Sequence, residues 1–519
     1  MEILDNKQLL IRTRRPHLVT EQIQGSTVLS TTGDIHEVSV NWGLPEAQTL
    51  NQLKIKNVPS PIKRDYDWPR PMGFTPFVHQ RETASFLTLN KKAFCFNEQG
   101  TGKTASVIWA SDYLMDLGLV KRVLVVCPLS IMESAWREDL FKFAIHRTVD
   151  VAHGSRERRK KIIDGGAEYI IINFDGIGTV LDTISQGGFD MIVVDEASAY
   201  KNSQTDRWKI MNSLSKAVDW LWMLTGTPAA QSPVDAYGLA KLVNPDNVPK
   251  WYGQFRDQVM YKIGMYKWAT KDNAKDVVHK ALQPAIRFEK KQCLDLPDVT
   301  HVDREAPLTA QQRKFYEELR KRMSIVAAGE EITGVNAATN LNKLLQISGG
   351  AVYSDSREVV EFDVSNRLQV VKEVIEEASH KVLVFVPFTH TIELLRNYLV
   401  KGGITCDVIN GQVPVKQRGE IVKRFQNEDN PRVLIIQPQA ASHGLTLTAA
   451  NVIVWYAPVT SVETYLQANA RIDRPGQKNP MTIVHIRGSE VERKLYSMLK
   501  TNVNNHNKII DLYRQEISS

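Results

Sequence analysis

The chain has 519 residues, which is too many for one hydrophobic core, so we expect two large domains and a small third one. Hydrophobic residues make up 43% of the chain and charged residues 24%, proportions that exclude a disordered or fibrous protein. The formal charge of +7 permits a polyanionic partner without establishing one.

The cysteines, the apolar runs and the amino terminus set further limits. The four cysteines are scattered, with no C-x-x-C pair, so the sequence indicates neither a zinc site nor a disulfide framework. No apolar run approaches the ~18 residues that a membrane span needs. Residues 1–10 carry early acids and no long apolar region, so we expect no signal peptide. We therefore expect a cytoplasmic protein (bacterial or host cytosol) with no membrane partner, and a monomer.

Residues 1–70 are expected to form a small β-rich accessory domain. The pattern from Val28 to Trp42 alternates, with Gly33-Asp34 at its middle, which predicts a hairpin with a tight turn. A short helix is predicted over Pro45–Leu53. A linker follows, marked by Pro59, Pro61, Pro69 and Pro71.

Two longer stretches, residues 71–285 and 286–519, alternate short apolar strands with helices. The first predicted set of strands is Ala93–Phe96, Val123–Cys127, Tyr169–Ile172, Met191–Val194 and Leu221–Leu224. The second set is Lys381–Val386, Thr405–Ile409, Val433–Ile436, Val452–Trp455 and Thr482–His485. Because these strands are apolar on both faces, each set predicts a buried parallel sheet. The fold class is thus α/β with two lobes, each with a helical insertion, and a carboxyl-terminal helix in the second. The polar, helix-rich residues 250–375 are expected to form an insertion and a bridge.

A glycine-rich turn follows the predicted strand that ends at Phe96 and precedes a helix that runs to about Leu117. Strand, glycine-rich turn, G-K-T and helix are the arrangement of a phosphate-binding loop. Lys103 would neutralise the β and γ oxygens of a nucleotide, and the Thr104 hydroxyl would reach Mg²⁺. Backbone N–H groups and the helix amino terminus would add to the anion site. The residues that would surround the phosphates are Gly100, Thr101, Gly102, Lys103 and Thr104.

A second cluster stands at the end of the predicted strand Met191–Val194. Parallel sheets bind ligands at the carboxyl ends of their strands, which is where Asp195 and Glu196 lie. Asp195 would hold Mg²⁺, directly or through water, and Glu196 would orient and deprotonate the attacking water. The alternative is that both carboxylates only cap the next helix. The phosphate-binding loop upstream favours the catalytic interpretation.

These motifs resemble those of the Swi/Snf-like branch of helicase superfamily two, over about residues 72–500. Residues 74–80 resemble its glutamine motif, in which Gln80 would read adenine. Residues 195–198 resemble its DEAH box, with Ser198 in place of the last histidine. Residues 224–228 are very similar to its L-T-G-T-P coupling motif, which contains Thr225, Gly226 and Thr227. The resemblance implies two RecA-like lobes that use ATP and Mg²⁺.

The second lobe carries the fifth and sixth motifs of the same family. Residues 441–447 resemble the fifth, in which Gly444 would couple the lobes, and residues 467–477, beginning at Gln467, strongly resemble the sixth. Arg471 and Arg474 are three apart on a predicted helix, so they are expected to share one face. They could touch the γ-phosphate only when the lobes close, an arrangement worth roughly 10³ to 10⁵ in rate. The alternative is a solvated basic helix face.

The resemblance also implies a double-stranded or branched DNA partner. In the family, DNA crosses both lobes and is contacted mostly at its phosphates, so binding would depend strongly on salt and weakly on sequence. The residues at the corresponding motif positions are Pro128, Ser130, Asn173, Thr389 and Thr446.

Three segments with basic residues are candidates for DNA contacts. Aromatic residues between Trp251 and Trp268 interleave with lysines and Arg256, which indicates either a packed helical core or a DNA-contacting insertion. Residues 156–161 form either a solvated helix face or a DNA contact. Arg12, Arg14 and Arg15 of the small domain are further candidates for DNA contacts.

The leading hypothesis is an ATP-dependent double-stranded DNA translocase. It would remodel DNA or protein–DNA structures, as in repair or recombination, by branch migration, fork remodelling, annealing or protein displacement. The alternatives are a strand-separating DNA or RNA helicase and an inactive DNA-binding scaffold. The lean chain length and the absence of reader domains favour a bacterial or phage relative.

Overall fold

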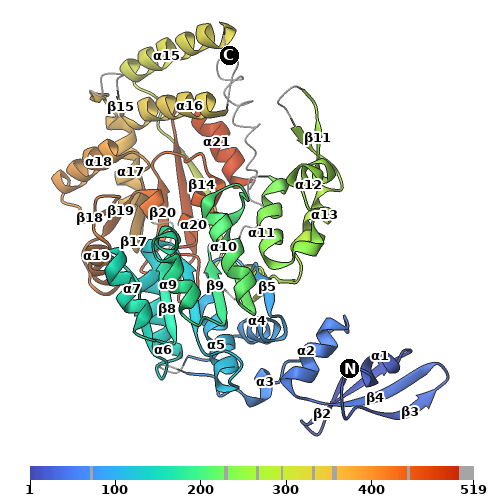
Figure 1. The fold of residues 1–519 in the computed structure, drawn as a ribbon. Coiled ribbons are helices and arrows are strands. Elements are labelled where there is room, and N and C mark those ends of the chain that lie inside the picture. Colours follow the sequence, from blue (N-terminus) through green and yellow to red (C-terminus); the bar gives the residue numbers. More distant parts are fainter. Residues whose placement is uncertain are drawn as a thin grey trace. The chain divides into compact units, whose positions relative to one another are not determined.

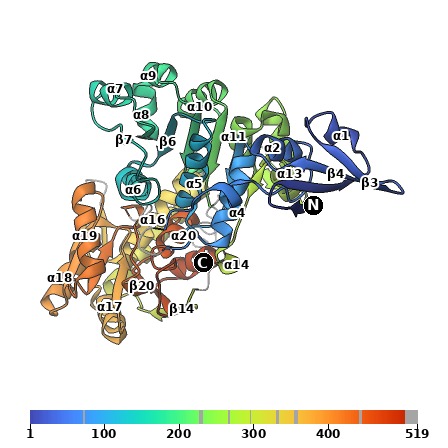
Figure 2. The same cartoon turned by 90° about the horizontal axis from the view of Figure 1, so that it is seen from below.

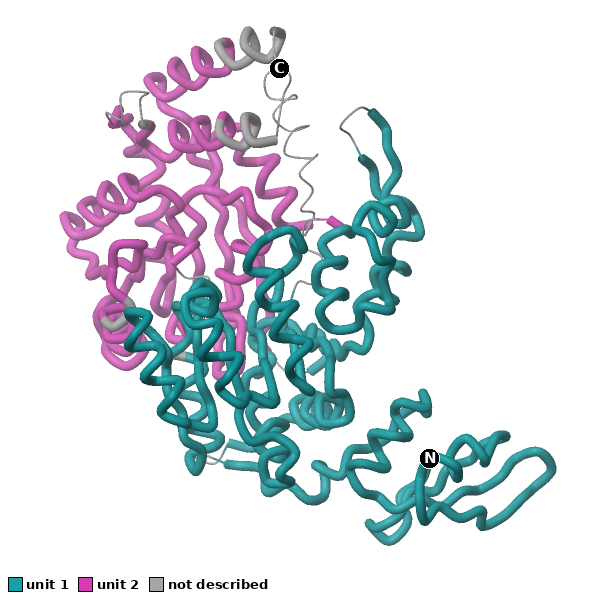
Figure 3. Tube along the Cα trace, viewed as in Figure 1, with its two compact units in different colours: residues 1–229, 233–293 teal, residues 230–232, 294–519 magenta. Residues whose placement is uncertain are grey.

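The computed structural model describes residues 1–70, 74–226, 232–264, 268–293, 296–329, 334–353, 359–440 and 445–501 (Figure 1). The chain divides into two compact units (Figure 3). Unit 1 comprises residues 1–229 and 233–293, and unit 2 comprises residues 230–232 and 294–519. Among the described residues, no helix combines the length and the apolar character that a membrane crossing needs.

The first 41 residues of unit 1 form a four-stranded antiparallel sheet in the order β1-β2-β4-β3. Its strands are β1 (Glu2–Leu4), β2 (Gln8–Thr13), β3 (Thr27–Thr32) and β4 (Ile35–Asn41). The predicted hairpin is confirmed, because Thr32 pairs with Ile35 across a two-residue turn whose Gly33 has φ +63°. The predicted short helix is confirmed as α2 (Leu44–Gln52).

This antiparallel sheet shares its hydrophobic core with the rest of unit 1. The buried face of β2 and β4 packs through α2 onto α4 (Val78–Leu89) and α5 (Lys103–Asp116) as one continuous cluster. Polar contacts reinforce this packing, since Gln48 Nε2 donates to the Thr88 carbonyl (2.8 Å) and Tyr66 Oη donates to Asp112 Oδ2 (2.7 Å). Burial raises the pKa of the Tyr66 hydroxyl far above its usual range, and the Asp112 charge adds to this shift.

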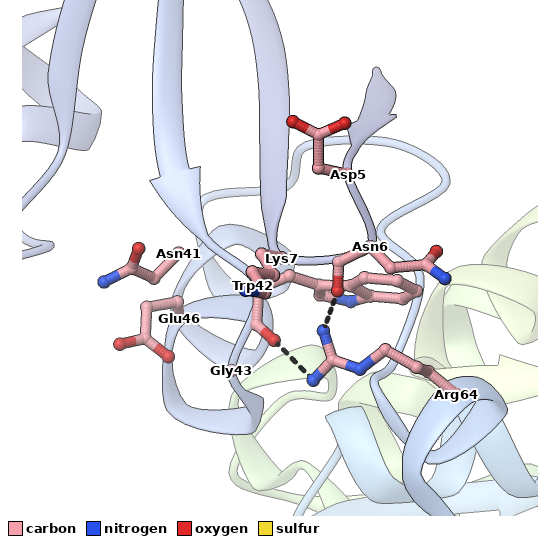
Figure 4. A pocket seen from close by; sticks show the side chains of 8 residues that line it. All are labelled: Asp5, Asn6, Lys7, Asn41, Trp42, Gly43, Glu46 and Arg64. Atoms are coloured by element: carbon pink, nitrogen blue, oxygen red, sulfur yellow. Dashed lines mark hydrogen bonds between the residues drawn. The ribbon is translucent and has the colours of Figure 1, made fainter.

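A surface pocket beside the antiparallel sheet is held in shape by one arginine (Figure 4). Arg64, on the short helix α3 (Ile62–Asp65), donates to the backbone carbonyls of Asn6 and Trp42, and its guanidinium lies 4.8 Å from the centre of the Trp42 ring. The arginine thus fastens the β1–β2 turn and the end of β4 to the segment that leads into α4.

A seven-stranded sheet, counted over the described residues, forms the centre of unit 1 in the order β13-β5-β10-β9-β6-β8-β7. All its pairings are parallel, as predicted. Its strands are β5 (Lys92–Cys95), β6 (Val123–Cys127), β7 (Val149–Val151), β8 (Tyr169–Asn173), β9 (Met191–Asp195), β10 (Trp220–Leu224) and β13 (Ala285–Ile286).

Alternate residues of these strands enter two different cores. Val123 and Val125 of β6 join α4, α5 and α6 (Glu138–Phe143) on one face, whereas Leu124 and Val126 join the helices of the other face. Those helices are α7 (Arg156–Asp164), α8 (Phe174–Thr179), α9 (Leu181–Gln186), α10 (Asp206–Ala217), α11 (Ala236–Val243), α12 (Tyr252–Val259) and α13 (Ala274–Ala281). Helices α7, α8 and α9 lie side by side (Figure 2).

Unit 2 contains a parallel sheet in the order β14-β21-β20-β17-β19-β18. Its strands are β14 (Val299–Glu305), β17 (Lys381–Phe385), β18 (Cys406–Ile409), β19 (Val433–Ile436), β20 (Ala450–Trp455) and β21 (Met481–Arg487). Helices α17 (Ser365–Glu377) and α18 (Thr389–Lys401) cover one face, and α19 (Val415–Asn427), α20 (Val462–Asn469) and α21 (Glu490–Lys500) cover the other. Helices α15 (Ala310–Gly329) and α16 (Gly334–Gly349) build a smaller core against α21.

The residues predicted to be an insertion and a bridge also supply an edge strand to each sheet. The two-residue β13 pairs with β5, and the seven residues of β14 pair with β21 from Val299–Met481 to Glu305–Arg487. The prediction missed β13 because it is so short, and β14 because its apolar residues are separated by polar ones, as an edge strand allows. The boundary between the units accordingly follows β13 and falls at Cys293.

Unit 2 contains a buried ion pair, from which a prediction about stability follows. Arg367 and Glu492 are almost fully buried, 2.8 Å apart, and Arg367 also donates to the Tyr456 carbonyl. Glu492→Gln should lower the free energy of unfolding by about 3 kcal/mol, because it leaves a buried guanidinium without its counter-charge. The matched control is Glu376→Gln, which removes an exposed i,i+4 partner of Lys372 and should cost about 0.5 kcal/mol or less. Urea denaturation measures the free energy of unfolding of both variants, and an equal loss in the two would contradict the prediction.

Candidate nucleotide-binding site

The sheet of unit 1 aligns the ends of three neighbouring strands. In the register of β5, β10 and β9, Leu224 pairs with Cys95 on one side and with Asp195 on the other. The turns that follow these three strands therefore leave the same edge of the sheet next to one another. They are the glycine-rich loop, the Thr225-Gly226 turn and the Asp195-Glu196 pair.

The glycine-rich loop follows β5 and leads into α5, as the sequence predicts. Gly100 and Gly102 have φ of +83° and +77°, in the left-handed region that favours glycine, and Gly102 directly precedes α5. The Lys103 amine donates to the carbonyls of Asn97 (2.8 Å) and Glu98 (3.2 Å), so its charge lies over the loop. Thr104 follows in the first turn of α5, whose amino terminus adds a partial positive charge.

Gln80 is buried beneath this loop. Its Oε1 accepts from the Phe77 N–H (2.9 Å), its Nε2 approaches the Thr101 carbonyl (3.5 Å), and a Cβ at Gly102 would lie 2.0 Å from that nitrogen. The neighbouring His79 ring also contacts the Thr101 carbonyl, at 2.8 Å. The glutamine motif therefore supports the loop from below, and the reading of adenine by Gln80 stays a prediction.

Asn97 stands where the family has an acid, and its contacts explain an amide at this position. The fully buried side chain donates through Nδ2 to Thr83 Oγ1 (2.8 Å) and accepts through Oδ1 from the Phe288 N–H (3.0 Å). A carboxylate could serve only as acceptor. Asn97 thereby joins the loop to α4 and to the segment that follows β13.

Asp195 and Glu196 occupy the end of β9. Burial raises the pKa of the Asp195 carboxyl, and the nearby Lys103 charge opposes this shift. Asp195 Oδ1 accepts from the Glu196 N–H (3.0 Å). Glu196 has φ +56° and ψ +55°, a left-handed conformation that is costly for a residue other than glycine. Strain of this kind is typical of functional sites.

A contact that the sequence did not predict reaches the same carboxylate. Trp136, six residues after Ser130, donates through its Nε1 to Asp195 Oδ2 at 3.0 Å. The indole is 1% exposed and lies on a π-helical turn, Met132–Arg137, labelled η3. No spacing rule connects positions 136 and 195, because the contact depends on the adjacency of β6 and β9.

The predicted coupling turn lies against the glycine-rich loop. The Thr225 N–H donates to the Cys95 carbonyl (3.1 Å), and a Cβ at Gly226 would lie 3.5 Å from Gln99 Cγ. The turn after β10 therefore contacts the loop after β5, so a change in the conformation of one would affect the other. Thr227 lies outside the described residues.

In unit 2 the two arginines come together in a different way from the prediction. Helix α20 ends at Asn469, so Arg471 and Arg474 lie in the turn that follows it and do not share a helix face. A helix through Arg474 is also disfavoured, because Pro475 disfavours helical geometry at the residue before it and Gly476 has φ +100°.

A shared backbone acceptor gathers both guanidinium groups instead. Arg471 Nη1 and Arg474 Nη1 both donate to the Leu445 carbonyl, at 3.3 Å and 3.0 Å. Arg474 Nη1 also donates to Thr446 Oγ1 (2.7 Å), which joins the sixth motif to the fifth. Gln467 is buried on α20, within reach of Glu463 Oε1 (3.3 Å), whereas Gly444 lies outside the described residues.

The predicted DNA positions of unit 1 also meet at one edge. Cys127 pairs with Asn173, so Pro128 and Ser130 after β6 lie near the end of β8. Asn173 Oδ1 accepts from Arg159 Nη1 (3.0 Å), whereas most basic residues of α7 are exposed, as a solvated face requires. In unit 2, Thr389 begins α18 and Thr446 accepts from Arg474. The location of these residues does not test whether they contact DNA, so their roles in DNA binding stay predictions.

The packed-core interpretation holds for only part of the aromatic segment, and the DNA-contacting interpretation stays a prediction. Phe255 is fully buried in the core, whereas Trp251 is 62% exposed and Tyr261 is 49% exposed. Trp268 stacks on the Arg256 guanidinium at 3.9 Å. Tyr266 and Lys267 lie outside the described residues.

A further cluster with metal-ligand chemistry is an ion-pair network. Asp112, Asp116 and His146 bring ligand-type atoms within 4.8 Å of one another. The Arg147 guanidinium donates to both aspartates, so a cation is already supplied by the protein. The hydrogen bonds to these carboxylates raise the Arg147 pKa despite its partial burial.

The fold and the site together define a helicase-like ATPase with two parallel-sheet units. A family model described as the SNF2-related domain matches residues 79–352, and one described as the helicase conserved C-terminal domain matches residues 366–476. The chain belongs to the SNF2-related family. The resemblance in the motifs is thereby confirmed.

Similar proteins come from several kinds of organism. A mouse chromodomain-helicase-DNA-binding protein 1-like is 25% identical over 80% of this chain and 47% of its own length, and an uncharacterized ATP-dependent helicase of Mycoplasma pneumoniae is 26% identical over 75% and 37%. The chain thus spans less than half the length of these curated relatives. A putative protein p41 of an aphid endosymbiont phage is 23% identical over 80% of this chain and 93% of its own. The Sulfolobus solfataricus SWI2/SNF2 ATPase core in complex with dsDNA is 22% identical, with a TM-score of 0.42, and the match covers 83% of this chain and 92% of that one.

The two glycines that flank α5 allow a controlled test of the loop. Gly102→Ala should weaken ATP binding by roughly tenfold or more, because a Cβ would strike the Gln80 amide, which is fixed by Phe77. Gly118→Ala has a similar left-handed penalty, φ +69°, but no atom within 4 Å, so it should cost about 1 to 2 kcal/mol of stability and leave ATP affinity unchanged. A fluorescent ATP analogue measures both variants. Equal ATP affinities in the two variants would contradict this account of the loop.

Proposed function

We propose that this protein is an ATP-dependent motor that moves along double-stranded DNA and remodels DNA or protein–DNA structures. One observation carries the proposal. Along one edge of one sheet, the strands β5, β10 and β9 end in the residues proposed for ATP, and the next strands, β6 and β8, end in the residues proposed for DNA. ATP chemistry and DNA contacts would thus share one rigid element.

The residues at this edge suit the hydrolysis of ATP. Lys103 would offset the phosphate charge, and Glu196 would hold and deprotonate the attacking water. The partly buried Asp195 carboxylate and the Thr104 hydroxyl fit Mg²⁺, a hard cation with oxygen ligands. When bound there, Mg²⁺ would neutralise charge on the β and γ oxygens.

The arginines of unit 2 would complete the reaction. We propose that Arg471 and Arg474, which share the Leu445 carbonyl, supply positive charge to the γ-phosphate in the transition state. Each hydrolysis event would then depend on a movement of one unit toward the other, which is the condition for a motor.

Single substitutions separate the roles of these groups. Glu196→Gln should lower ATP turnover about 10² to 10⁴-fold and keep ATP binding, because only the base is lost.

Arg474→Ala should lower turnover about 10³-fold or more with ATP affinity retained. Arg432→Ala is the control for Arg474→Ala, since Arg432 also donates to backbone carbonyls of unit 2, those of Ile375 and Ala378. Steady-state kinetics measure the turnover of each variant, and nucleotide titration measures its affinity for ATP. An Arg474→Ala variant that hydrolyses ATP at the wild-type rate would remove the arginine from the mechanism.

A strand-separating helicase is the second candidate, and one feature favours it. The hairpin of β11 (Met260–Lys262) and β12 (Trp268–Thr270) carries Tyr261 and Ile263, which are 49% and 57% exposed. An exposed apolar hairpin is suited to wedge between strands. The β11–β12 hairpin forms a two-stranded sheet of its own, whereas the residues proposed for DNA end strands of the same sheet as the residues proposed for ATP, so we favour translocation.

Two DNA substrates distinguish the candidates. With ATP, the wild-type protein should displace the third strand of a triplex and leave a forked duplex paired, since a translocase follows phosphates without opening base pairs. Lys103→Ala should do neither and serves as the control. Efficient fork unwinding without triplex displacement would instead establish the strand-separating helicase.

We further propose that residues 1–70 direct the motor to particular DNA structures. Surface substitutions such as Arg15→Ala suit this question better than deletion, because deletion would remove the cover from apolar residues of α4 and α5.

A further inference from the structure

We infer that Trp136 is a positioning residue that connects the predicted DNA segment after β6 to the Mg²⁺-binding carboxylate of Asp195. The inference rests on the proposed function, in which Asp195 holds the cation. It adds a physical link by which DNA would change the rate of ATP hydrolysis.

The hydrogen bond is well placed to orient the carboxylate. Trp136 Nε1 donates to Asp195 Oδ2 at 3.0 Å, and the Glu196 N–H donates to Oδ1 at 3.0 Å. Each carboxylate oxygen therefore has one fixed donor from the protein, and its remaining lone pairs stay available to a cation. Partners of this kind set the orientation of metal-binding carboxylates.

The absence of charge on the Trp136 N–H group matters for Mg²⁺ binding as much as the position of that group. An indole N–H is uncharged, so it orients Asp195 without neutralising the charge that attracts Mg²⁺. A lysine or arginine in the same place would compete with the cation. The carboxylate is partly buried at the end of β9, where a hydrogen bond is stronger than in bulk water.

The backbone before Trp136 connects it to Ser130, one of the residues proposed to contact DNA. Ser130 lies in the 3₁₀ turn η2 (Leu129–Ile131), and the π-helical turn η3 follows without a break and carries Trp136. The two turns contact each other, and η3 also contacts β7 and β8. Single π-helical turns are rare and occur often at functional sites. A phosphate bound at Ser130 would therefore shift η3, and the indole would pass this shift to Asp195.

The competing explanation is that Trp136 only fills space in the core, and this explanation predicts a different effect of removing its N–H group. Trp136 belongs to the core cluster with Ile131, Met132 and Leu140, which needs the volume of the ring and not its N–H. The core explanation predicts that loss of the N–H alone leaves the Mg²⁺ dependence of the enzyme unchanged. The positioning explanation predicts that the Mg²⁺ dependence moves.

Trp136→Phe removes the N–H and keeps an aromatic ring in the core. We expect the duplex-stimulated kcat to fall about tenfold, as for the loss of one hydrogen bond to a charged group. The half-saturating Mg²⁺ concentration should rise several-fold, excess Mg²⁺ should restore part of the rate, and the KM for ATP should stay unchanged. The rate without DNA should fall less, because DNA acts through η3.

Trp222→Phe is the matched control. Trp222 is also fully buried in unit 1 and donates its Nε1 to a carbonyl, that of Asn90 (3.0 Å), away from Asp195. It should lose a similar amount of thermal stability and keep the wild-type Mg²⁺ dependence. If the two variants have the same Mg²⁺ dependence, Trp136 is a core residue and the inference fails.

Two further proteins keep the result interpretable. Should Trp136→Phe not fold, site-specific replacement of Trp136 by benzothienylalanine keeps the ring shape and substitutes sulfur for the N–H, with the same expected shift in Mg²⁺ dependence. Asp195→Asn tests the proposed function itself, because it should abolish Mg²⁺-dependent turnover. Turnover that survives Asp195→Asn overturns the proposed function, whereas its loss together with a wild-type response of the Trp136 variants overturns only the inference.

Discussion

The parallel register of β5, β10 and β9 is the constraint on which the candidate site depends. Because Leu224 pairs with both Cys95 and Asp195, three loops that are far apart in the sequence leave the sheet side by side. Contacts between the loops then follow from their position, as in the approach of Gly226 to Gln99. The same register places β6, and through it Trp136, next to the carboxylate at the end of β9.

Features with a local physical cause could be predicted from the sequence. Strands apolar on both faces, a tight hairpin turn and glycines at left-handed positions each reflect the preferences of a few neighbouring residues, and the structure contains all three. The missed features depend on partners distant in the chain. Edge strand β14 exists because β21 pairs with it along its whole length, and the contact of Trp136 with Asp195 exists because β6 lies beside β9. The helical placement of Arg474 was wrong because a three-residue spacing outweighed the proline that follows it.

Two residues of the motifs, Asn97 and Thr446, make contacts that explain their side chains. Asn97 needs an amide because it donates to Thr83 and accepts from Phe288. Thr446 accepts from Arg474, so a hydroxyl at this position tethers the sixth motif to the fifth. These polar contacts hold the loops of each unit in place before any ligand binds, which lowers the cost of ordering them during a reaction cycle.

The central claim is that one edge of the unit 1 sheet serves both ATP and DNA. The most direct measurement is the steady-state rate of ATP hydrolysis by the wild-type protein, with and without linear double-stranded DNA of random sequence. The account predicts a slow rate alone, a rate raised at least tenfold by saturating duplex, and a loss of this stimulation as salt screens the phosphates. Hydrolysis that proceeds at the same rate with and without duplex would contradict it.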